Sequence, residues 1–284
     1  MTYIPSYLAF LAAALTSSLA LAGVSNDIPS CYEANKMKVQ PAATETEVFV
    51  LIDQTTPLDA SLQDAVRENA GRLVKAGSAF VIASFSSFGQ GRYLEVLSVG
   101  KLEGQIDPKL RDDISVKVLH NFDACMAGQA NYGRNAATKA LNKALVGISP
   151  DFAKSDVMGS LKELSSRIKQ SGAKEKVVFI VSDMLENSGI SSFYASKNVR
   201  AIEPSVELKT AQAAQVVGDF GGARIFVLGA GLVQENVGGK NKDSGIYRNP
   251  KTMSSLRQFW QMYFDASNAK LIEFGAPALL SPVK

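Results

Sequence analysis

The chain has 284 residues, with 30 lysines and arginines against 27 aspartates and glutamates, so its formal net charge is +3. This length suits one sizeable α/β domain, and the lack of a basic run argues against a nucleic-acid-binding surface. The single histidine, His120, disfavours a histidine-based metal site or catalytic dyad. We expect His120 to lie on the surface.

Residues 1–22 are predicted to be a secretory signal (Met1 to Ala22) and not part of the fold. An apolar run over residues 8–22 ends in Ala20-Leu21-Ala22, a small-x-small cleavage pattern, and the run is short for a membrane span. No lysine or arginine precedes it, so the alternative is an uncleaved anchor or a wrongly chosen start. The expected location is periplasmic or secreted, with membrane attachment only through a retained N-terminal segment.

The two cysteines, Cys31 and Cys125, are predicted to form a disulfide if the protein is exported. Two free or buried thiols are the alternative. In the chain-entropy model, closing a loop of this length stabilises a fold by roughly 4–5 kcal/mol. Residues 23–46 are polar and without periodicity, which predicts an irregular lead-in that Cys31 would pin.

The first strand of the domain is predicted at residues 48–53, where apolar residues run straight into Asp53. A run that is apolar on both faces is typical of a strand buried between two layers in a parallel sheet. Thr56 and Pro57 then resemble a helix start, with Thr56 as the N-cap and Pro57 in the first helical position. The helix is expected to continue to about residue 74.

The remaining elements alternate between strands and helices. Strands at residues 79–85 and 93–99 are joined by a short turn, so we expect them to be antiparallel. The other expected elements are helices at about 123–146, from about 155 to 172, at about 206–217 and around residues 256–263, and strands at 177–182, 224–228 and 270–274. We expect Phe259, Trp260 and Tyr263 to be core residues. Residues 47–284 therefore predict a single α/β domain with a doubly wound, mostly parallel, Rossmann-like sheet and one antiparallel edge strand.

This order of elements, with polar residues ending the first and fourth strands, resembles the von Willebrand factor A (vWA) fold. The resemblance extends from about Glu45 to Gly275. In that family a divalent cation, usually magnesium, lies above the sheet. It is held by a D-x-S-x-S motif after the first strand, a threonine in a later loop and an aspartate after the fourth strand, and a ligand carboxylate often completes the shell.

The vWA resemblance implies a set of metal ligands in this chain. Asp53 and Thr55 match the first aspartate and the first hydroxyl, while the second hydroxyl falls on Pro57, which has none. Ser155 matches the loop threonine, and Asp183 matches the last aspartate. Magnesium accepts water where a side chain is lacking, so a water-rich magnesium site is one expectation. A degenerate, metal-free domain, in which the hydroxyls merely cap helices, is the other.

The function implied by the resemblance is an exported binding or adhesion module, and not an enzyme. Its protein or peptide partner is expected at the carboxyl edge of the sheet, ringed by the long loops at residues 184–206 and 231–249. Met184, Phe193 and Tyr194 lie in the first of these loops, where we expect partial burial on the domain's own surface, with a binding rim as the alternative. A metal-free structural subunit of an envelope assembly is a further alternative.

Two enzyme motifs are weaker matches. An apolar strand that ends in D-x-T also resembles haloacid-dehalogenase-type phosphatases, in which Asp53 would be the nucleophile of a magnesium-dependent phosphohydrolase. Glu186 would then be the only nearby second acid, and it is loosely spaced from Asp183. Gly229-Ala230-Gly231 lacks the third glycine of a dinucleotide motif and is interpreted as a tight turn.

Overall fold

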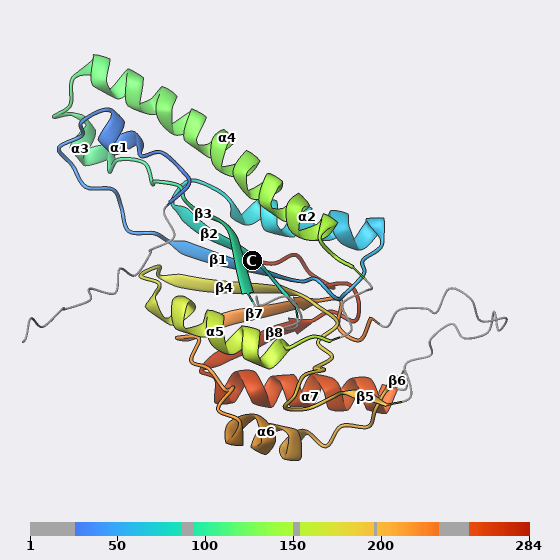
Figure 1. Cartoon of the computed structure of the whole chain (residues 1–284). Helices are drawn as coiled ribbons and strands as arrows, with labels where there is room; N and C mark the ends of the chain where they lie inside the picture. Colours follow the sequence, from blue (N-terminus) through green and yellow to red (C-terminus); the bar gives the residue numbers. More distant parts are fainter. Residues whose placement is uncertain (1–25, 87–93, 150–153, 196–197, 233–249) are drawn as a thin grey trace, which may run out of the picture.

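The computed structural model describes residues 26–86, 94–149, 154–195, 198–232 and 250–284. Its centre is a six-stranded sheet of order β3-β2-β1-β4-β7-β8 (Figure 1). The strands are β1 (Thr46–Asp53), β2 (Ser78–Phe85), β3 (Leu94–Lys101), β4 (Glu175–Val181), β7 (Ala223–Leu228) and β8 (Ala269–Phe274). Only the edge pair β2–β3 is antiparallel within this sheet. The predicted α/β fold class, a doubly wound and mostly parallel sheet with one antiparallel edge strand, is confirmed, whereas the predicted signal lies outside the described residues.

Helices cover both faces of the sheet. Figure 1 shows α2 (Ala60–Leu73) and α4 (Val116–Val146) on one face. The other face carries α5 (Val157–Gln170) and α7 (Pro250–Ala266), and α6 (Pro204–Ala213) packs against α7. Within the described ranges, no helix is long and apolar enough to span a membrane.

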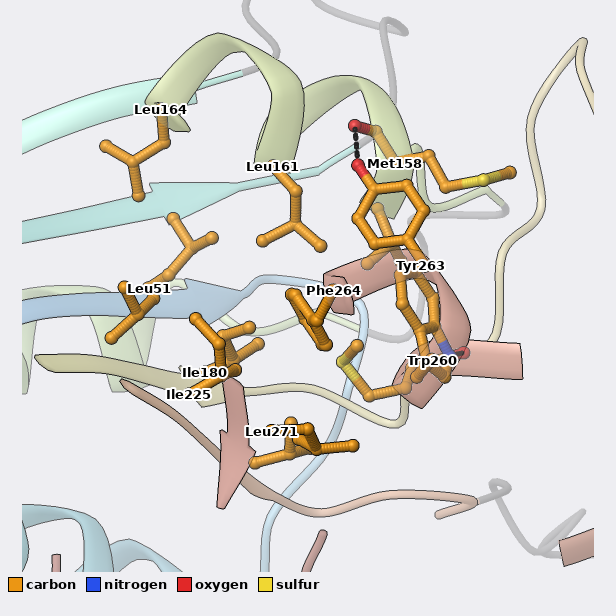
Figure 2. Close-up of a cluster of buried hydrophobic side chains, with 14 of the residues drawn as sticks. Leu51, Met158, Leu161, Leu164, Ile180, Ile225, Trp260, Tyr263, Phe264 and Leu271 are labelled. Carbon is orange, nitrogen blue, oxygen red and sulfur yellow. Dashed lines mark hydrogen bonds between the residues drawn. The ribbon is translucent and has the colours of Figure 1, made fainter. Parts of the chain in front are cut away.

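The hydrophobic core follows from the apolar pattern of β1. Phe49 and Leu51 point to the cluster under α5 and α7, while the alternate residues point to the cluster under α2 and α4. Figure 2 shows the first of these clusters, in which Trp260 and Tyr263 are fully buried. Phe259 is equally buried, so the prediction that these three aromatic residues belong to the core is confirmed.

Two predicted helix starts are wrong. Helix α2 begins at Ala60 and is capped by Asp59, whose Oδ1 accepts from the backbone N–H of Leu62 at 2.8 Å. Thr56 is not the cap, because its hydroxyl accepts from the backbone of Asp183 instead. Helix α4 begins at Val116 and not near residue 123. Its first turns are largely exposed, so they lack the apolar periodicity that identifies a helix in sequence.

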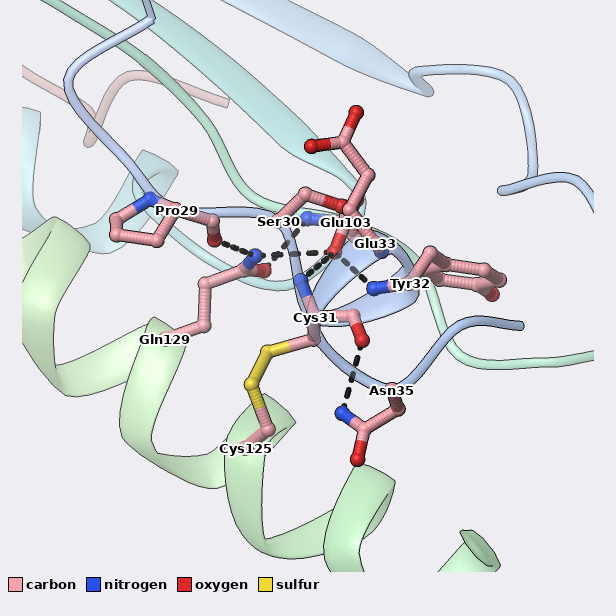
Figure 3. Close-up of a disulfide and its surroundings, with 9 residues drawn as sticks. All are labelled: Pro29, Ser30, Cys31, Tyr32, Glu33, Asn35, Glu103, Cys125 and Gln129. Carbon is pink, nitrogen blue, oxygen red and sulfur yellow. Dashed lines mark hydrogen bonds between the residues drawn. A yellow bond between two sulfur atoms is a disulfide. The ribbon is translucent and has the colours of Figure 1, made fainter.

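The lead-in is more ordered than predicted. It contains the short helix α1 (Cys31–Ala34), and a disulfide joins Cys31 to Cys125 of α4, 94 residues away (Figure 3). This is the disulfide that the sequence predicted. A second short helix, α3 (Pro108–Arg111), precedes α4. His120 lies on the exposed side of α4, as expected.

Candidate functional site

The candidate site lies where β1 and β4 end side by side. Ile52 of β1 is paired with Val181 of β4 in a parallel ladder, so the residues that follow, Asp53 and Ser182, emerge at the same edge of the sheet. Open α/β sheets place their ligands at this carboxyl edge. The residues just before α5, including Ser155, come to the same place.

The carboxylate of Asp53 is the centre of this cluster. Its Oδ1 accepts from the backbone N–H of Thr55 at 2.9 Å and from the Thr55 hydroxyl at 2.6 Å. Its Oδ2 accepts from the hydroxyls of Ser182 at 2.7 Å and Ser155 at 3.1 Å. A carboxylate offers about four acceptor positions. Protein donors therefore occupy all the acceptor positions of Asp53, which is fully buried.

Asp183, the other predicted carboxylate, is also held by the protein. Its Oδ1 accepts from the backbone N–H of Leu185 at 2.8 Å, and its Oδ2 accepts from the Tyr194 hydroxyl at 2.9 Å. Its backbone N–H donates to the hydroxyl of Thr56 at 3.0 Å. The two buried aspartates thus lie at adjacent strand ends, each surrounded by hydrogen-bond donors.

Burial controls the ionisation of this cluster. Burial raises the pKa of Asp53, while the hydrogen bonds from Thr55, Ser182 and Ser155 act in the opposite direction. Burial also raises the pKa of Tyr194, and the negative charge of Asp183 raises it further. The Tyr194 phenol therefore keeps its proton and acts as a donor.

The segment that carries Tyr194 is anchored in the core. Tyr194 belongs to a short antiparallel ribbon of β5 (Tyr194–Ala195) and β6 (Asn198–Val199). The preceding residue, Phe193, is fully buried and makes edge contacts with Phe259 and Trp260, at centroid distances of 5.1 and 6.4 Å. The guanidinium of Arg200 lies 5.6 Å from the Phe193 ring centroid.

The candidate binding rim is only partly exposed. Met184 and Phe193 are fully buried, so the burial that the sequence favours holds for these two residues and the rim alternative does not. Met184 is held by a hydrogen bond from Trp260 Nε1 to its carbonyl oxygen at 2.9 Å. Tyr194 is partly exposed and contacts the cluster directly. Of the second loop, residues 233–249 lie outside the described residues.

Three of the four predicted metal ligands converge directly. Asp53, Thr55 and Ser155 form one hydrogen-bonded group, while Asp183 is joined to Thr56 and Tyr194. The described part of the chain contains no group of three or more His, Cys, Asp or Glu side chains placed to hold a metal. The other two predicted ligands, the hydroxyl oxygens of Thr55 and Ser155, are neutral. Magnesium sites instead use one or two carboxylates.

The side chains in this arrangement therefore do not fit a directly coordinated magnesium ion. All acceptor positions of Asp53 are used, each oxygen of Asp183 already accepts a hydrogen bond, and Pro57 supplies no ligand. Magnesium binding stays a prediction from the vWA resemblance.

The geometry also does not favour the phosphohydrolase hypothesis. A nucleophilic carboxylate needs an accessible oxygen near the phosphorus, but Asp53 is buried and saturated with hydrogen bonds. The second acid that was considered, Glu186, accepts from the backbone N–H of Met158 at the start of α5 at 2.9 Å. Its Oε2 is therefore held by the helix start and not by the Asp53 cluster.

Three contributors to the cluster were missed or misassigned by sequence reasoning. The sequence indicates Ser182 only as the last residue of a strand, Thr56 as a helix cap, and Tyr194 as a partly buried loop residue with no partner assigned. Gly231 also contributes, because its backbone N–H donates to the carbonyl of Asp183 at 2.7 Å. The positive φ angles of Gly229 and Gly231, 100° and 69°, fit the tight turn that was expected there.

No protein-family model matches the chain, and no curated protein matches it. Solved structures of similar fold include the PilB minor pilin from Streptococcus sanguinis, with 12% identity and a TM-score of 0.43, covering 83% of this chain and 58% of that one. Another is an aerotolerance-related membrane protein from Bacteroides fragilis NCTC 9343, with 14% identity and a TM-score of 0.35, covering 81% of this chain and 91% of that one. A third is the vWF domain of the type V pili tip protein Mfa5 from Porphyromonas gingivalis, with 12% identity and a TM-score of 0.32, covering 62% of this chain and 53% of that one. The chain thus spans little more than half of the pilin and of the Mfa5 domain, and such likenesses carry no conclusion about function.

Proposed function

We propose that this chain is a non-enzymatic binding module that engages a protein or peptide partner at the carboxyl edge of its sheet. The supporting observation is the Asp53 cluster, a buried polar group that fixes three chain segments at one edge. Rigid support of this kind lowers the entropy cost of binding, because the contact residues are already in place. The buried hydrogen bonds of the cluster suit it to holding the backbone of a binding face in place, and not to catalysis.

The proposed contact surface is the polar rim directly above the cluster. Gln54 and Thr55 are partly exposed, and Lys154 and Gly189 are exposed. Gln54 is held in place because its side-chain amide donates to the carbonyl of Ala144 at 2.9 Å. The backbone N–H of Ser149 donates to the carbonyl of Gln54 at 2.9 Å. These groups offer hydrogen-bond donors and acceptors on a fixed backbone, which suits recognition of a polypeptide.

Export is part of the same proposal. The disulfide between Cys31 and Cys125 supports it, because disulfides persist in the periplasm and outside the cell and are rare in the cytosol. A metal-free structural subunit of an envelope assembly is a second candidate. The observation that favours it is the closure of the Asp53 cluster by the chain's own donors, with no carboxylate oxygen of Asp53 left for a ligand.

Site-specific photo-crosslinking in the source organism tests the proposed binding face. Gly189, at the carboxyl edge, and Gly172, between α5 and β4 at the opposite edge, are both exposed, and an added Cβ meets no atom within 4 Å at either position. Each glycine is replaced by p-benzoylphenylalanine in the full-length protein, and adducts are identified by mass spectrometry.

We expect one defined adduct from position 189 that position 172 does not give. The purified adduct partner should then bind the purified protein, and Thr55→Ala should weaken that binding. Equal adducts from both positions, or none from position 189, would contradict the proposal. If position 189 crosslinks to an assembly component and Thr55→Ala has no effect on binding, the structural-subunit candidate is favoured instead.

A further inference from the structure

Two buried carboxylates at neighbouring strand ends need compensation, because burial of an unpaired charge is costly. In the vWA family, which this chain resembles, the residues at the matching positions hold a divalent cation. In this chain hydrogen-bond donors surround both carboxylates. Three of them, Thr55, Ser155 and Ser182, serve Asp53, and Tyr194 serves Asp183.

We propose that Tyr194 takes the place of the divalent cation at Asp183, so that the cluster is closed by the chain itself. The phenol donates to Asp183 Oδ2 at 2.9 Å, so a donor of the chain itself already engages this carboxylate oxygen. The inference concerns the same edge as the proposed function but does not depend on any partner.

The position of Tyr194 is set by its neighbours and not by the hydrogen bond alone. Tyr194 is paired with Val199 in the β5–β6 ribbon. On one side of it, Phe193 is buried in the aromatic cluster of α7. On the other side, Arg200 forms an ion pair with Glu207 of α6, and its backbone N–H donates to the carbonyl of Phe193 at 2.9 Å.

Glu207 is also nearly buried, and the Ser191 hydroxyl donates to its Oε2 at 2.8 Å. The ribbon is therefore attached to α6 and to α7 independently of Asp183. A cation entering the cluster would have to displace a phenol that these two attachments hold in place. Pro57 stands where the vWA motif has its second hydroxyl ligand. The absence of that hydroxyl is consistent with a cluster that needs no metal.

The test measures thermal unfolding of the purified mature protein with millimolar Mg²⁺, with Mn²⁺ and with EDTA. It compares the natural chain with Tyr194→Phe, which keeps the ring and removes the donor. The control is Tyr132→Phe, which removes the hydroxyl of a tyrosine that is 53% exposed on α4. Manganese binding is followed in parallel by electron paramagnetic resonance.

The natural protein is expected to have the same unfolding midpoint in all three conditions and to leave manganese free. Tyr194→Phe should unfold at a temperature lower by about 5 °C. Because this variant frees Asp183 Oδ2, a hydrated cation can contact that oxygen through its bound water, so either cation should restore part of the loss in a saturable way. Tyr132→Phe should match the natural protein throughout.

Three results would overturn the proposal. The first is saturable manganese binding by the natural protein, which can be measured even if Tyr194→Phe fails to fold. The second is an unfolding midpoint for Tyr194→Phe equal to that of Tyr132→Phe. The third is a destabilised Tyr194→Phe that neither cation stabilises, which would make the hydrogen bond purely structural. None of these results depends on the crosslinking experiment, so the proposed binding function would stand or fall separately.

Discussion

The hydroxyl of Ser182 donates to Asp53 Oδ2 at 2.7 Å, although the two residues are 129 positions apart in the chain. This contact joins the end of β1 to the end of β4. Ser155 donates to the same oxygen from the segment before α5. Asp53 is therefore the common acceptor for side-chain hydroxyls from three chain segments: the end of β1, the end of β4 and the segment before α5.

We predict that Asp53→Ala destabilises the fold by about 3 kcal/mol or more, because it leaves several buried donors without an acceptor. Asp53→Asn should cost less, since the serine hydroxyls can rotate to accept from the new amide. Urea unfolding gives both free energies of unfolding. The control is Asp64→Ala on α2, whose side chain is 79% exposed in a surface ion pair, so its effect should stay within about 0.5 kcal/mol. Equal effects for Asp53→Ala and Asp64→Ala would show that the cluster contributes nothing to stability.

The raised pKa of the buried Glu186 carboxyl makes the stability of the fold depend on pH. Burial raises the pKa of this carboxyl to about 8 from 4.5, with the charge of Asp156 adding to the effect and hydrogen bonds from Ser188 and Met158 opposing it. Its Oε1 has no hydrogen-bond partner among the described residues. The folded state therefore favours the protonated, neutral acid.

Because the folded pKa lies above the unfolded one, the folded protein binds more protons between these values. The stabilising contribution of Glu186 is complete below about pH 4.5 and is lost as the pH rises to about 8. We expect Glu186→Gln, which mimics the neutral acid, to gain stability relative to the natural protein over this pH window. Urea unfolding at a series of pH values measures the difference. Glu163→Gln on the exposed side of α5 is the control, and a parallel pH profile for both variants would refute the prediction.

The disulfide predicts a local as well as a global effect. It closes a loop of 94 residues, for which the chain-entropy model gives about 4–5 kcal/mol. The double variant Cys31→Ser with Cys125→Ser should therefore unfold at lower urea. Glu103 still holds the lead-in, since its Oε2 accepts from the backbone N–H groups of Cys31 and Tyr32, as Figure 3 shows.

We expect the remaining contacts of Glu103 to keep the double variant folded. Hydrogen exchange should then accelerate in the lead-in before it does in β1 or β4. The control is Ser205→Ala on α6, where the exposed hydroxyl has only a local contact. Uniform acceleration across the sheet would mean that the disulfide acts on the unfolded state alone.

The fold could be predicted from the sequence because each buried strand is a continuous run of apolar residues. β1 and β4 are apolar on both faces and end in polar residues, which locates them and their order along the chain. The antiparallel edge strand followed from the short connection between β2 and β3. The start of α4 could not be predicted, because its first half packs on α1 and the lead-in and not on the sheet.

The site was predictable only in part. Asp53, Thr55 and Ser155 were found because a family pattern connects them, and they do converge. Tyr194 was not assigned to Asp183, because a hydrogen bond between a loop tyrosine and a strand-end aspartate leaves no periodic signal. Nor does sequence show that donors already occupy a carboxylate, since this depends on how three separate segments pack.

We predict that a hydrogen bond from Trp260 couples the core to the segment that leads to Tyr194. Its indole Nε1 donates to the carbonyl of Met184 at 2.9 Å, and both residues are fully buried. Trp260→Phe keeps an aromatic ring but leaves that carbonyl without its donor, which costs about 1–3 kcal/mol. The loss should be concentrated in the segment from residue 184 to the ribbon, so its amide hydrogens should exchange about five- to 100-fold faster.

Hydrogen exchange followed by mass spectrometry measures this effect segment by segment. Phe264→Leu is the matched control, because Phe264 is equally buried on α7 and contacts the Trp260 ring, but it donates no hydrogen bond to the loop. We expect Phe264→Leu to lower global stability without selectively accelerating exchange at residues 185–194. If both variants accelerate that segment equally, packing alone holds the ribbon, and the Trp260 hydrogen bond has no separate part in positioning Tyr194.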